Sequence, residues 1–313
     1  MKKSILKAGI IVSFFMLCGC ATPPQTQHLL NNPPPHLPAS ANINNLPFYP
    51  QQAYYCGPTT LAEIFEFNGI KLSPEEIAPQ LFIPGRKGSL QLEMIAAIRQ
   101  QGLLAYSERS HLEQLITLVN LNIPIIVLQN LGLDWYPLWH YAVVKGYDLN
   151  TQEIILHSAD TANRRVDLAL FERTWQRANF WSVIALPAQH SLKELNAFNY
   201  LKAAQDLLLV GQTHAGIAHL EKATQLWPEQ WLSYFLLGNY YLTHDITRSV
   251  NWFEQGLPLA LTETNYLNNY AYALFKNKQI HLAKTMIEQA LKLAPNDANL
   301  LDTQAEIVGF ISQ

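Results

Sequence analysis

The sequence has 313 residues, of which 49% are apolar and 14% are charged, and its formal net charge is -3. This length is typical of about two domains, and the apolar content excludes an intrinsically disordered chain, which would combine low hydrophobicity with high net charge. The absence of a basic excess argues against a dedicated nucleic-acid-binding protein, and three cysteines are too few for a disulfide scaffold.

The first 20 residues have the layout of an export signal. A positively charged start precedes an apolar run, 8–17, that is too short to span a bilayer. The run ends in Leu-Cys-Gly-Cys, which resembles the lipobox of bacterial lipoproteins, with Cys18 in the slot that usually holds another small residue. The resemblance implies that residues 1–20 include a lipoprotein signal peptide and that Cys20 is lipidated after cleavage.

The residue after Cys20 bears on the location of the protein. In Gram-negative lipoproteins an Asp at that position is the usual signal for inner-membrane retention, and this sequence has Ala21. The resemblance therefore implies an exported protein with a lipid anchor in a bacterial membrane. In a Gram-negative host this is the outer membrane, with the protein facing the periplasm. The alternative is an ordinary signal peptide that is cleaved after a small residue.

Residues 21–47 are rich in proline and asparagine. Proline at this density disfavours helices and sheets and favours an extended, semi-rigid coil. The composition therefore predicts a tether that holds a globular body away from a membrane.

Residues 48–187 have a mixed pattern of helices and strands. Helices are expected over 59–67, from the capping box 73–76, from Ser89 to Gly102 and over 111–122. Strand-like runs follow at 123–129, 140–147, 153–157 and 180–186, with a hairpin loop at 148–150. Helices that are followed by an antiparallel sheet predict an α+β domain.

Residues 197–313 carry no strand pattern and are interpreted as paired amphipathic helices. "LEKATQLWP" recurs as "IEQALKLAP", and the spacing from Ala223 to Ala290 is close to twice the tetratricopeptide period of about 34 residues. The segment 197–296 therefore resembles about three tetratricopeptide repeats, with 298–313 as a capping helix and an irregular middle repeat. The resemblance implies an all-α domain whose concave face binds a peptide or partner protein. The alternative is a helical bundle without a repeat.

Cys56 is the candidate nucleophile. It lies just before a predicted helix, where unpaired N–H groups and the helix dipole lower a thiol pKa and favour the thiolate. Gln51, a few residues upstream, places a side-chain amide near the same point, so that this amide and the Cys56 N–H are expected to form an oxyanion hole. Once Cys18 leaves with the signal and Cys20 becomes the anchor, Cys56 is the only remaining thiol.

A nucleophilic cysteine of this kind needs a histidine partner. His140 begins the apolar strand "HYAVVKGY" and follows a loop with several aromatic residues. The other nine histidines are interpreted as solvated polar residues of loops, the tether or helix faces. A third group should orient the imidazole, and Asp160, after the next strand, is the nearest suitable carboxylate.

These motifs resemble the bacteriocin-processing (double-glycine leader) cysteine peptidase family over about 48–187. The resemblance rests on Gln51…Cys56-Gly-Pro, on the strand that starts at His140, and on an acid after the next strand. It implies a papain-like cysteine peptidase in which Cys56 is the nucleophile and His140 is the general base and acid. It further implies that Asp160 orients the histidine and that Gln51 stabilises the oxyanion.

Two departures from the family pattern leave alternatives open. The family usually has Asp or Asn followed by Pro after that strand, whereas 157–160 reads His-Ser-Ala-Asp. Ser158 or His157 is therefore an alternative to Asp160 as the orienting residue, and Gln52 competes with Gln51. The transporter domains that often follow this peptidase are absent from the sequence.

The sequence as a whole predicts an envelope-anchored peptidase that hydrolyses a peptide bond through a thioester, with its substrate or partner held by the repeats. No metal-ligand spacing or glycine-rich phosphate loop occurs, so neither a metal nor a cofactor is expected. One alternative is a catalytically inactive scaffold lipoprotein that acts through its repeats. The other is an amidase or transferase acting on peptidoglycan cross-links. Glu63 and Asp148 are interpreted as surface charges.

Overall fold

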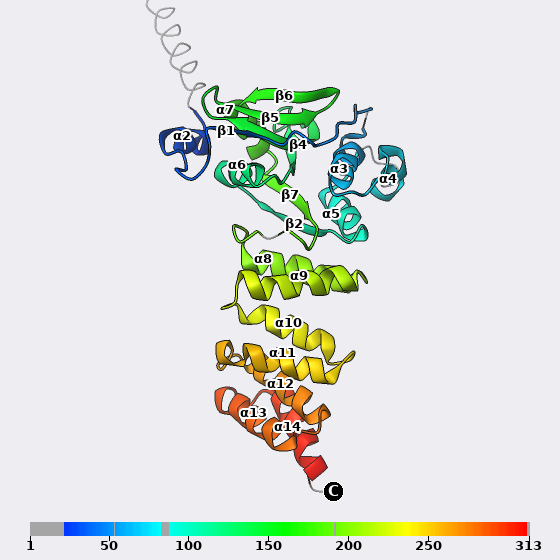
Figure 1. Cartoon of the computed structure of the whole chain (residues 1–313), viewed down its shortest axis with the longest axis vertical. Coiled ribbons are helices and arrows are strands. Elements are labelled where there is room, and N and C mark those ends of the chain that lie inside the picture. Colours follow the sequence, from blue (N-terminus) through cyan, green and yellow to red (C-terminus); the bar gives the residue numbers. More distant parts are fainter. Residues whose placement is uncertain (1–21, 53, 83–87, 191, 312–313) are drawn as a thin grey trace, which may run out of the picture. The chain divides into compact units, whose positions relative to one another are not determined.

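The computed structural model describes residues 22–52, 54–82, 88–190 and 192–311 (Figure 1). The predicted signal peptide and the lipidated Cys20 lie outside these residues. Within them, no helix is both long and apolar enough to cross a membrane. The contacts divide the chain into two compact units. One unit ends at Ile184, and the other combines Ile98–Tyr106 with the residues from Ala185 onward.

A sheet of seven strands is the centre of the first unit, although residues 104–106 of β2 and 185–186 of β7 belong to the second unit by their contacts. Its strands are β1 (Ser40–Asn42), β2 (Leu104–Arg109), β3 (Ile125–Asn130), β4 (Trp139–Asp148), β5 (Glu153–Ser158), β6 (Thr161–Asp167) and β7 (Trp181–Leu186). Their order is β2-β7-β3-β4-β5-β6, with β1 beside β4. The pairs from β7 to β6 are antiparallel, so the predicted α+β class with an antiparallel sheet is confirmed.

Six helices accompany this sheet in the described residues. They are α2 (Pro24–Asn31), α3 (Cys56–Phe67), α4 (Pro74–Leu81), α5 (Gln91–Gln100), α6 (Leu112–Asn120) and α7 (Leu168–Gln176). The capping box of α4 forms as the sequence predicts, because the Ser73 hydroxyl accepts from the Glu76 N–H while the Glu76 carboxylate accepts from the Ser73 N–H. Helix α3 begins at Cys56, three residues before the expected start, since Pro58 fits the first turn of a helix.

The N-terminal segment differs from the extended tether that its composition predicts. It contains helix α2 and strand β1, and β1 pairs with β4 so that Ser40 lies opposite Asp148. Glu172 of α7 is buried and accepts hydrogen bonds from the Gln25 N–H (3.0 Å) and from the N–H (2.6 Å) and hydroxyl (2.7 Å) of Thr26. A carboxylate at the first turn of α2 satisfies its free N–H groups and its dipole.

We expect Glu172→Ala to release this segment. The change leaves the N–H groups at the start of α2 without their acceptor, so it should lower the free energy of unfolding by about 2–3 kcal/mol. Urea unfolding measures this loss, and thermolysin should then cut within 22–50. Glu113→Ala, at an exposed carboxylate of α6, is the matched control. Equal proteolysis of the two variants would contradict the assigned role of Glu172.

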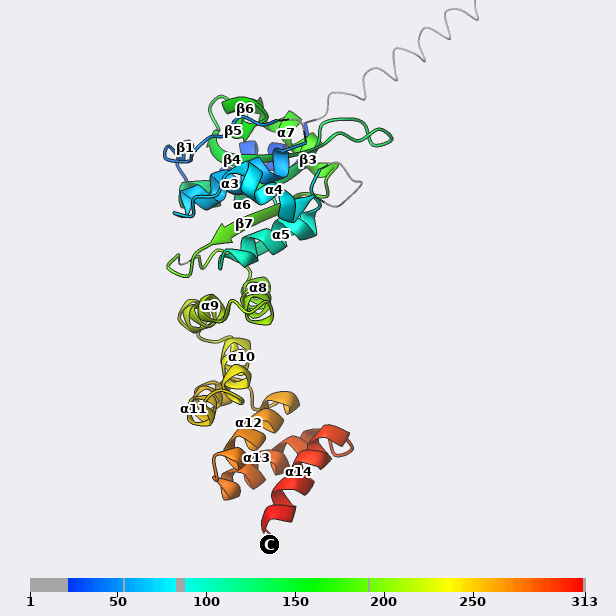
Figure 2. The same cartoon turned by 90° about the vertical axis from the view of Figure 1, so that its right-hand side faces the viewer.

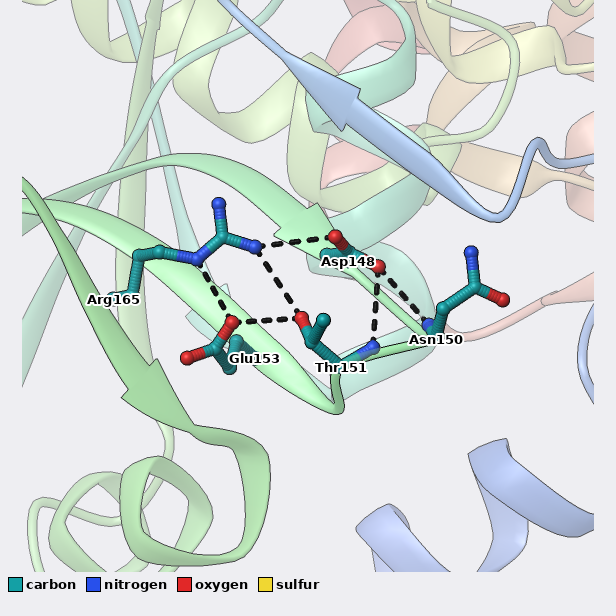
Figure 3. A network of polar contacts seen from close by, with 5 residues as sticks. All are labelled: Asp148, Asn150, Thr151, Glu153 and Arg165. Atoms are coloured by element: carbon teal, nitrogen blue, oxygen red, sulfur yellow. Dashed lines mark hydrogen bonds and ion pairs between the residues drawn. The ribbon is translucent and has the colours of Figure 1, made fainter.

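A polar network fixes the turn between β4 and β5 (Figure 3). Asp148 accepts from the N–H groups of Asn150 (3.0 Å) and Thr151 (3.3 Å). Arg165 of β6 donates to Asp148 (3.1 Å) and Glu153 (2.8 Å). The turn lies where the sequence places a hairpin loop. Asp148, interpreted as a surface charge, thus organises the turn at the carboxyl end of β4.

The second unit is helical, as predicted. Its helices are α8 (Ala197–Leu209), α9 (Thr213–Leu226), α10 (Trp231–Tyr241), α11 (Ile246–Gly256), α12 (Thr264–Lys276), α13 (Ile280–Leu293) and α14 (Ala298–Ile311). They pack as the pairs α8–α9, α10–α11 and α12–α13, and α14 lies against the last pair. Gly238 permits the close approach within the middle pair, because a Cβ there would lie 2.8 Å from the Phe253 ring. Arg99, at the end of α5, belongs to this unit by its contacts and forms an ion pair with Asp206.

Candidate active site

Cys56 is the first residue of α3 and is half-buried. The backbone N–H groups of Tyr141, Gly57 and Cys56 donate hydrogen bonds to its sulfur and lower its pKa, but burial has the larger effect and raises the pKa above its ordinary value. The expectation that the helix N-terminus lowers the pKa of the Cys56 thiol below its ordinary value is therefore wrong, because the effect of burial is larger. Gly57 is required here, because a Cβ would lie 2.4 Å from the Ser89 hydroxyl.

His140 lies beside Tyr141 at the start of β4, opposite Gln129 of β3. Because the Tyr141 N–H reaches the sulfur of Cys56, the structure brings the two predicted catalytic residues to one place. The ring Nε2 of His140 lies 2.9 Å from the hydroxyl of Ser158. Burial, and then the positive charge of Arg164, lower the pKa of His140 to about 4. The imidazole is therefore neutral at neutral pH.

The three candidates for the orienting group lie in different surroundings, and His157 is buried with its ring 3.6 Å from the Glu63 carboxylate. Ser158 is buried and contacts the His140 ring. Asp160 is exposed, and its carboxylate accepts a hydrogen bond of 3.0 Å from the Thr161 hydroxyl. A left-handed turn at Ala159, with φ of 55°, separates Ser158 from Asp160. The orienting role of Asp160 thus stays a prediction, and Ser158 is the residue in contact with the ring.

Gln51 and Gln52 both line the same cleft as Cys56 and His140. The Gln51 N–H donates to the Ala159 carbonyl at 3.1 Å, so the segment before Cys56 is fixed to the turn after β5. The choice of Gln51 over Gln52 stays a prediction.

The cleft has a volume of about 1250 Å³. Gln51, Cys56, His140 and Asp160 all line it, so the four residues proposed for catalysis share one cavity. Its remaining walls include apolar side chains such as Leu90, Leu138 and Trp139. Among the described residues, no group of three or more His, Cys, Asp and Glu is placed to hold a metal ion.

A buried charged cluster lies behind the site, and the sequence interpretation missed it. Glu63, interpreted as a surface charge, is 1% exposed. Its carboxylate lies 3.6 Å from the His157 ring and accepts a hydrogen bond from the Tyr49 N–H at 3.2 Å. Lys145 is also buried and donates to Asn163 at 2.6 Å. The pair of Glu63 and His157 connects the helix that begins at Cys56 with the strand that ends at Ser158.

Burial raises the pKa of Glu63, and the neighbouring His157 only partly opposes this shift. A signal for this cluster is present in the sequence, since Glu63 stands two helical turns after Cys56, between the apolar residues Ala62 and Ile64. The sequence gives no such signal for its partner His157, which is predicted to be a solvated histidine. The burial of both side chains depends on the packing of α3 on the sheet, which the sequence does not display.

We expect Glu63→Gln to change the pH dependence of stability. A carboxyl whose pKa is raised by folding stabilises the protein fully below its unfolded pKa, and this contribution is lost as pH rises through the folded pKa. Glutamine resembles the protonated carboxyl, so the variant should lose less stability than the wild type between pH 4 and 8, as measured by urea unfolding. Glu75→Gln, exposed on α4, should behave as the wild type. Parallel curves for wild type and Glu63→Gln would refute this role.

Known proteins resemble the two parts of the chain separately. Residues 43–183 match the Peptidase_C39 like family. These residues form a C39-like peptidase domain. Among solved structures, a C39-like protein from Bacillus anthracis is 16% identical, with 49% of this chain and 99% of that chain covered and a TM-score of 0.41. The peptidase domain of Streptococcus ComA, a bifunctional ABC transporter involved in quorum sensing, is 22% identical, with 45% and 99% covered and a TM-score of 0.39.

The helical unit that follows the C39-like domain is similar to tetratricopeptide structures. YrrB, a TPR protein with an unusual peptide-binding site, is 21% identical, with 37% of this chain and 60% of that chain covered and a TM-score of 0.34. The first TPR of Spaghetti (RPAP3), bound to an HSP90 peptide, is 15% identical, with 37% and 96% covered and a TM-score of 0.35. No curated protein matches the chain.

The contact between Ser158 and His140 gives a prediction for the C39-like domain. We expect Ser158→Asp to raise the pKa of His140 from about 4, because an adjacent carboxylate stabilises the imidazolium. Nuclear magnetic resonance titration of the histidine rings measures this without a substrate. Thr161→Asp adds the same charge at an exposed position and should raise the pKa less. A wild-type His140 that titrates near the ordinary value of about 6.5 would overturn the assignment.

Proposed function

We propose that this protein is an envelope-anchored cysteine peptidase that hydrolyses a peptide bond through a thioester intermediate. The observation that carries the proposal is the meeting of Cys56 and His140 in one cleft of a C39-like domain, with the N–H of Tyr141 donating to the sulfur. A cysteine at a helix N-terminus beside a histidine is the arrangement that nucleophilic catalysis requires.

The pKa directions indicate the resting state of the pair. The raised pKa of Cys56 and the low pKa of His140 favour a neutral thiol next to a neutral imidazole. As the sulfur attacks the substrate carbonyl, His140 accepts the thiol proton through the ring nitrogen that Ser158 does not occupy. The Cys56 N–H and the Gln51 amide then stabilise the oxyanion.

The second half of the reaction reverses the proton transfer. His140 gives its proton to the departing amine, the C–N bond breaks and an acyl thioester remains on Cys56. His140 then removes a proton from water, which attacks the thioester. The carboxylic acid leaves, and the thiol regains its proton from His140.

Anchoring and docking complete the proposal. The lipobox that ends at Cys20 supports attachment to a membrane, which is the outer membrane facing the periplasm in a Gram-negative host. A groove in the helical unit supports docking of a substrate or partner peptide. It is lined by Phe235, Asn265, Asn268, Asn269, Asn299, Asp302 and Thr303. Side-chain amides both donate and accept hydrogen bonds, so they suit a peptide backbone.

We expect the wild-type protein to cleave members of a mixed peptide library, with cut sites identified by mass spectrometry. Cys56→Ala and His140→Ala should each abolish cleavage, because they remove the nucleophile and the base. Asp245→Ala, at the cap of α11 in the other unit, is the control that should retain activity. Cleavage that survives Cys56→Ala would refute the mechanism.

The pH profile tests the same proposal independently. His140 must be neutral to accept a proton, so kcat/KM should fall only as pH drops toward its pKa of about 4. Iodoacetamide labelling of Cys56 should increase with pH through a value above the ordinary thiol pKa, because burial raises the pKa of this group. A labelling rate that is already maximal at neutral pH would contradict the neutral pair.

A catalytically inactive scaffold is the second candidate. It is favoured by the hydroxyl of Ser158 at the position next to His140, since a neutral group gives no electrostatic support to an imidazolium. This candidate predicts no cleavage of the peptide library or of muropeptides, and full function of Cys56→Ala in the cell.

A further inference from the structure

The hairpin between β3 and β4 exposes an unusual number of large apolar side chains. We call residues 131–139 the apolar hairpin, and it stands away from the sheet (Figure 2). Its large apolar members are 47–81% exposed and are Leu131, Leu133, Trp135, Tyr136, Leu138 and Trp139. Single exposed apolar residues are common on protein surfaces, but a contiguous group of this kind marks an interaction site.

The backbone of the apolar hairpin is held in one shape. The Leu131 N–H donates to the Leu138 carbonyl at 2.9 Å. The buried Asn130 amide oxygen accepts from the N–H groups of Gly132 and Leu138, each at 2.9 Å. Arg177 donates to the Gly132 carbonyl at 2.8 Å. These bonds preorganise the hairpin, so its apolar side chains face solvent persistently and are ready for a ligand.

Gly132 shows how closely the two arms of the hairpin approach. A Cβ at this position would lie 2.4 Å from the Tyr136 carbonyl oxygen and 2.9 Å from the Leu138 nitrogen. Only glycine permits this approach without a shift of the backbone. The tight hairpin is therefore a built feature of the chain.

The apolar hairpin is continuous with the candidate active site. Leu138 and Trp139 line the cleft that also contains Cys56 and His140. Leu90 and Leu92 line the same cleft and are 42% and 74% exposed. An apolar path thus leads from the reacting groups out along the hairpin. A ligand that enters the cleft with large apolar side chains would cover these surfaces.

The charge of the hairpin distinguishes a peptide from a lipid surface. Residues 131–139 contain no Lys or Arg, and their only charged residue is Asp134, whose side chain is 87% exposed and lies 3.9 Å from the guanidinium of Arg177. Anionic membranes attract segments rich in basic residues, and the hairpin itself has none. Continuity with the cleft and the lack of basic residues in the hairpin both favour a peptide.

We propose that the apolar hairpin is the specificity element of the cleft, and that it binds aromatic or large aliphatic side chains of the peptide substrate close to the scissile bond. This inference rests on the proposed peptidase function. It assigns Leu138 and Trp139 to contacts next to the reacting groups and Trp135 to contacts farther from them.

Binding to a protein that cannot cleave tests the inference separately from catalysis. The whole chain carrying Cys20→Ser and Cys56→Ala is titrated into two fluorescein-labelled ten-residue peptides, and anisotropy is measured. One peptide has alternating Phe and Leu among Ser and Gly, and in the other Ser replaces each apolar residue. We expect the apolar peptide to bind at least about 10-fold more tightly, as apolar contacts of this size allow.

Variants assign that preference to the hairpin. Trp135→Ser combined with Leu138→Ser should remove most of the preference. Leu170→Ser changes an apolar residue that is 51% exposed on α7 and should leave the preference unchanged. Equal binding of the two peptides, or an unchanged preference in the double variant, would overturn the inference.

Vesicles of phosphatidylethanolamine and phosphatidylglycerol test the lipid alternative. We expect the Trp135→Ser, Leu138→Ser change to leave any cosedimentation of the Cys20→Ser, Cys56→Ala protein with these vesicles unchanged. Cosedimentation that the double variant abolishes would assign the hairpin to the membrane and overturn the inference. Failure of the peptidase proposal has a different signature, because it would show as absent cleavage by the wild type whatever the binding result.

Discussion

The packing of the first turn of α3 against the start of β4 creates the site. Through it the Tyr141 N–H reaches the sulfur of Cys56, and His140 is next to Tyr141 on the same strand. The same packing buries the thiol and the imidazole, so it sets their proton affinities as well as their positions. Glu63 and His157 join the same helix to β5. The helix that begins at Cys56 is thereby connected to the strand that ends at Ser158.

Burial gives this site a particular electrostatic character. It raises the pKa of Cys56 and lowers that of His140, because a low-dielectric environment disfavours the charged form of each group. A carboxylate in contact with the imidazole would reverse the second effect, but the contact is made by the hydroxyl of Ser158. The hydroxyl contacts the ring without adding charge, so the thiol and the imidazole are both favoured in their neutral forms.

The sequence predicted those parts of the site that depend on residue type and local order. Cys56 before a helix and His140 at the start of a strand are recognisable because nucleophilic catalysis needs those types at those places. The sequence does not decide which of three residues contacts the His140 ring, since the path of the chain after β5 depends on a left-handed turn at Ala159. Burial of Glu63 was not predictable because it depends on the packing of α3 on the sheet.

The N-terminal segment illustrates the same limit. Its proline content favours an extended coil in isolation, but Glu172, distant in sequence, supplies the acceptor that stabilises the first turn of α2. Composition indicates only the local conformational preference of a segment, and here a tertiary contact decides the conformation. The helical pairs of the second unit were predictable because their apolar periodicity is a local property of each helix.

Because α2 packs against the C39-like unit, the chain between this unit and its predicted anchor is short. Only Ala21, Thr22 and Pro23 separate Cys20 from the first residue of α2, and an extended chain of this length spans at most about 14 Å. If Cys20 carries lipid, the unit that holds the cleft is confined to the membrane surface, and its effective substrates are those that come within one protein diameter of the bilayer. The distance of a peptide from the membrane then limits which peptides reach the cleft, in addition to how well each peptide fits the cleft.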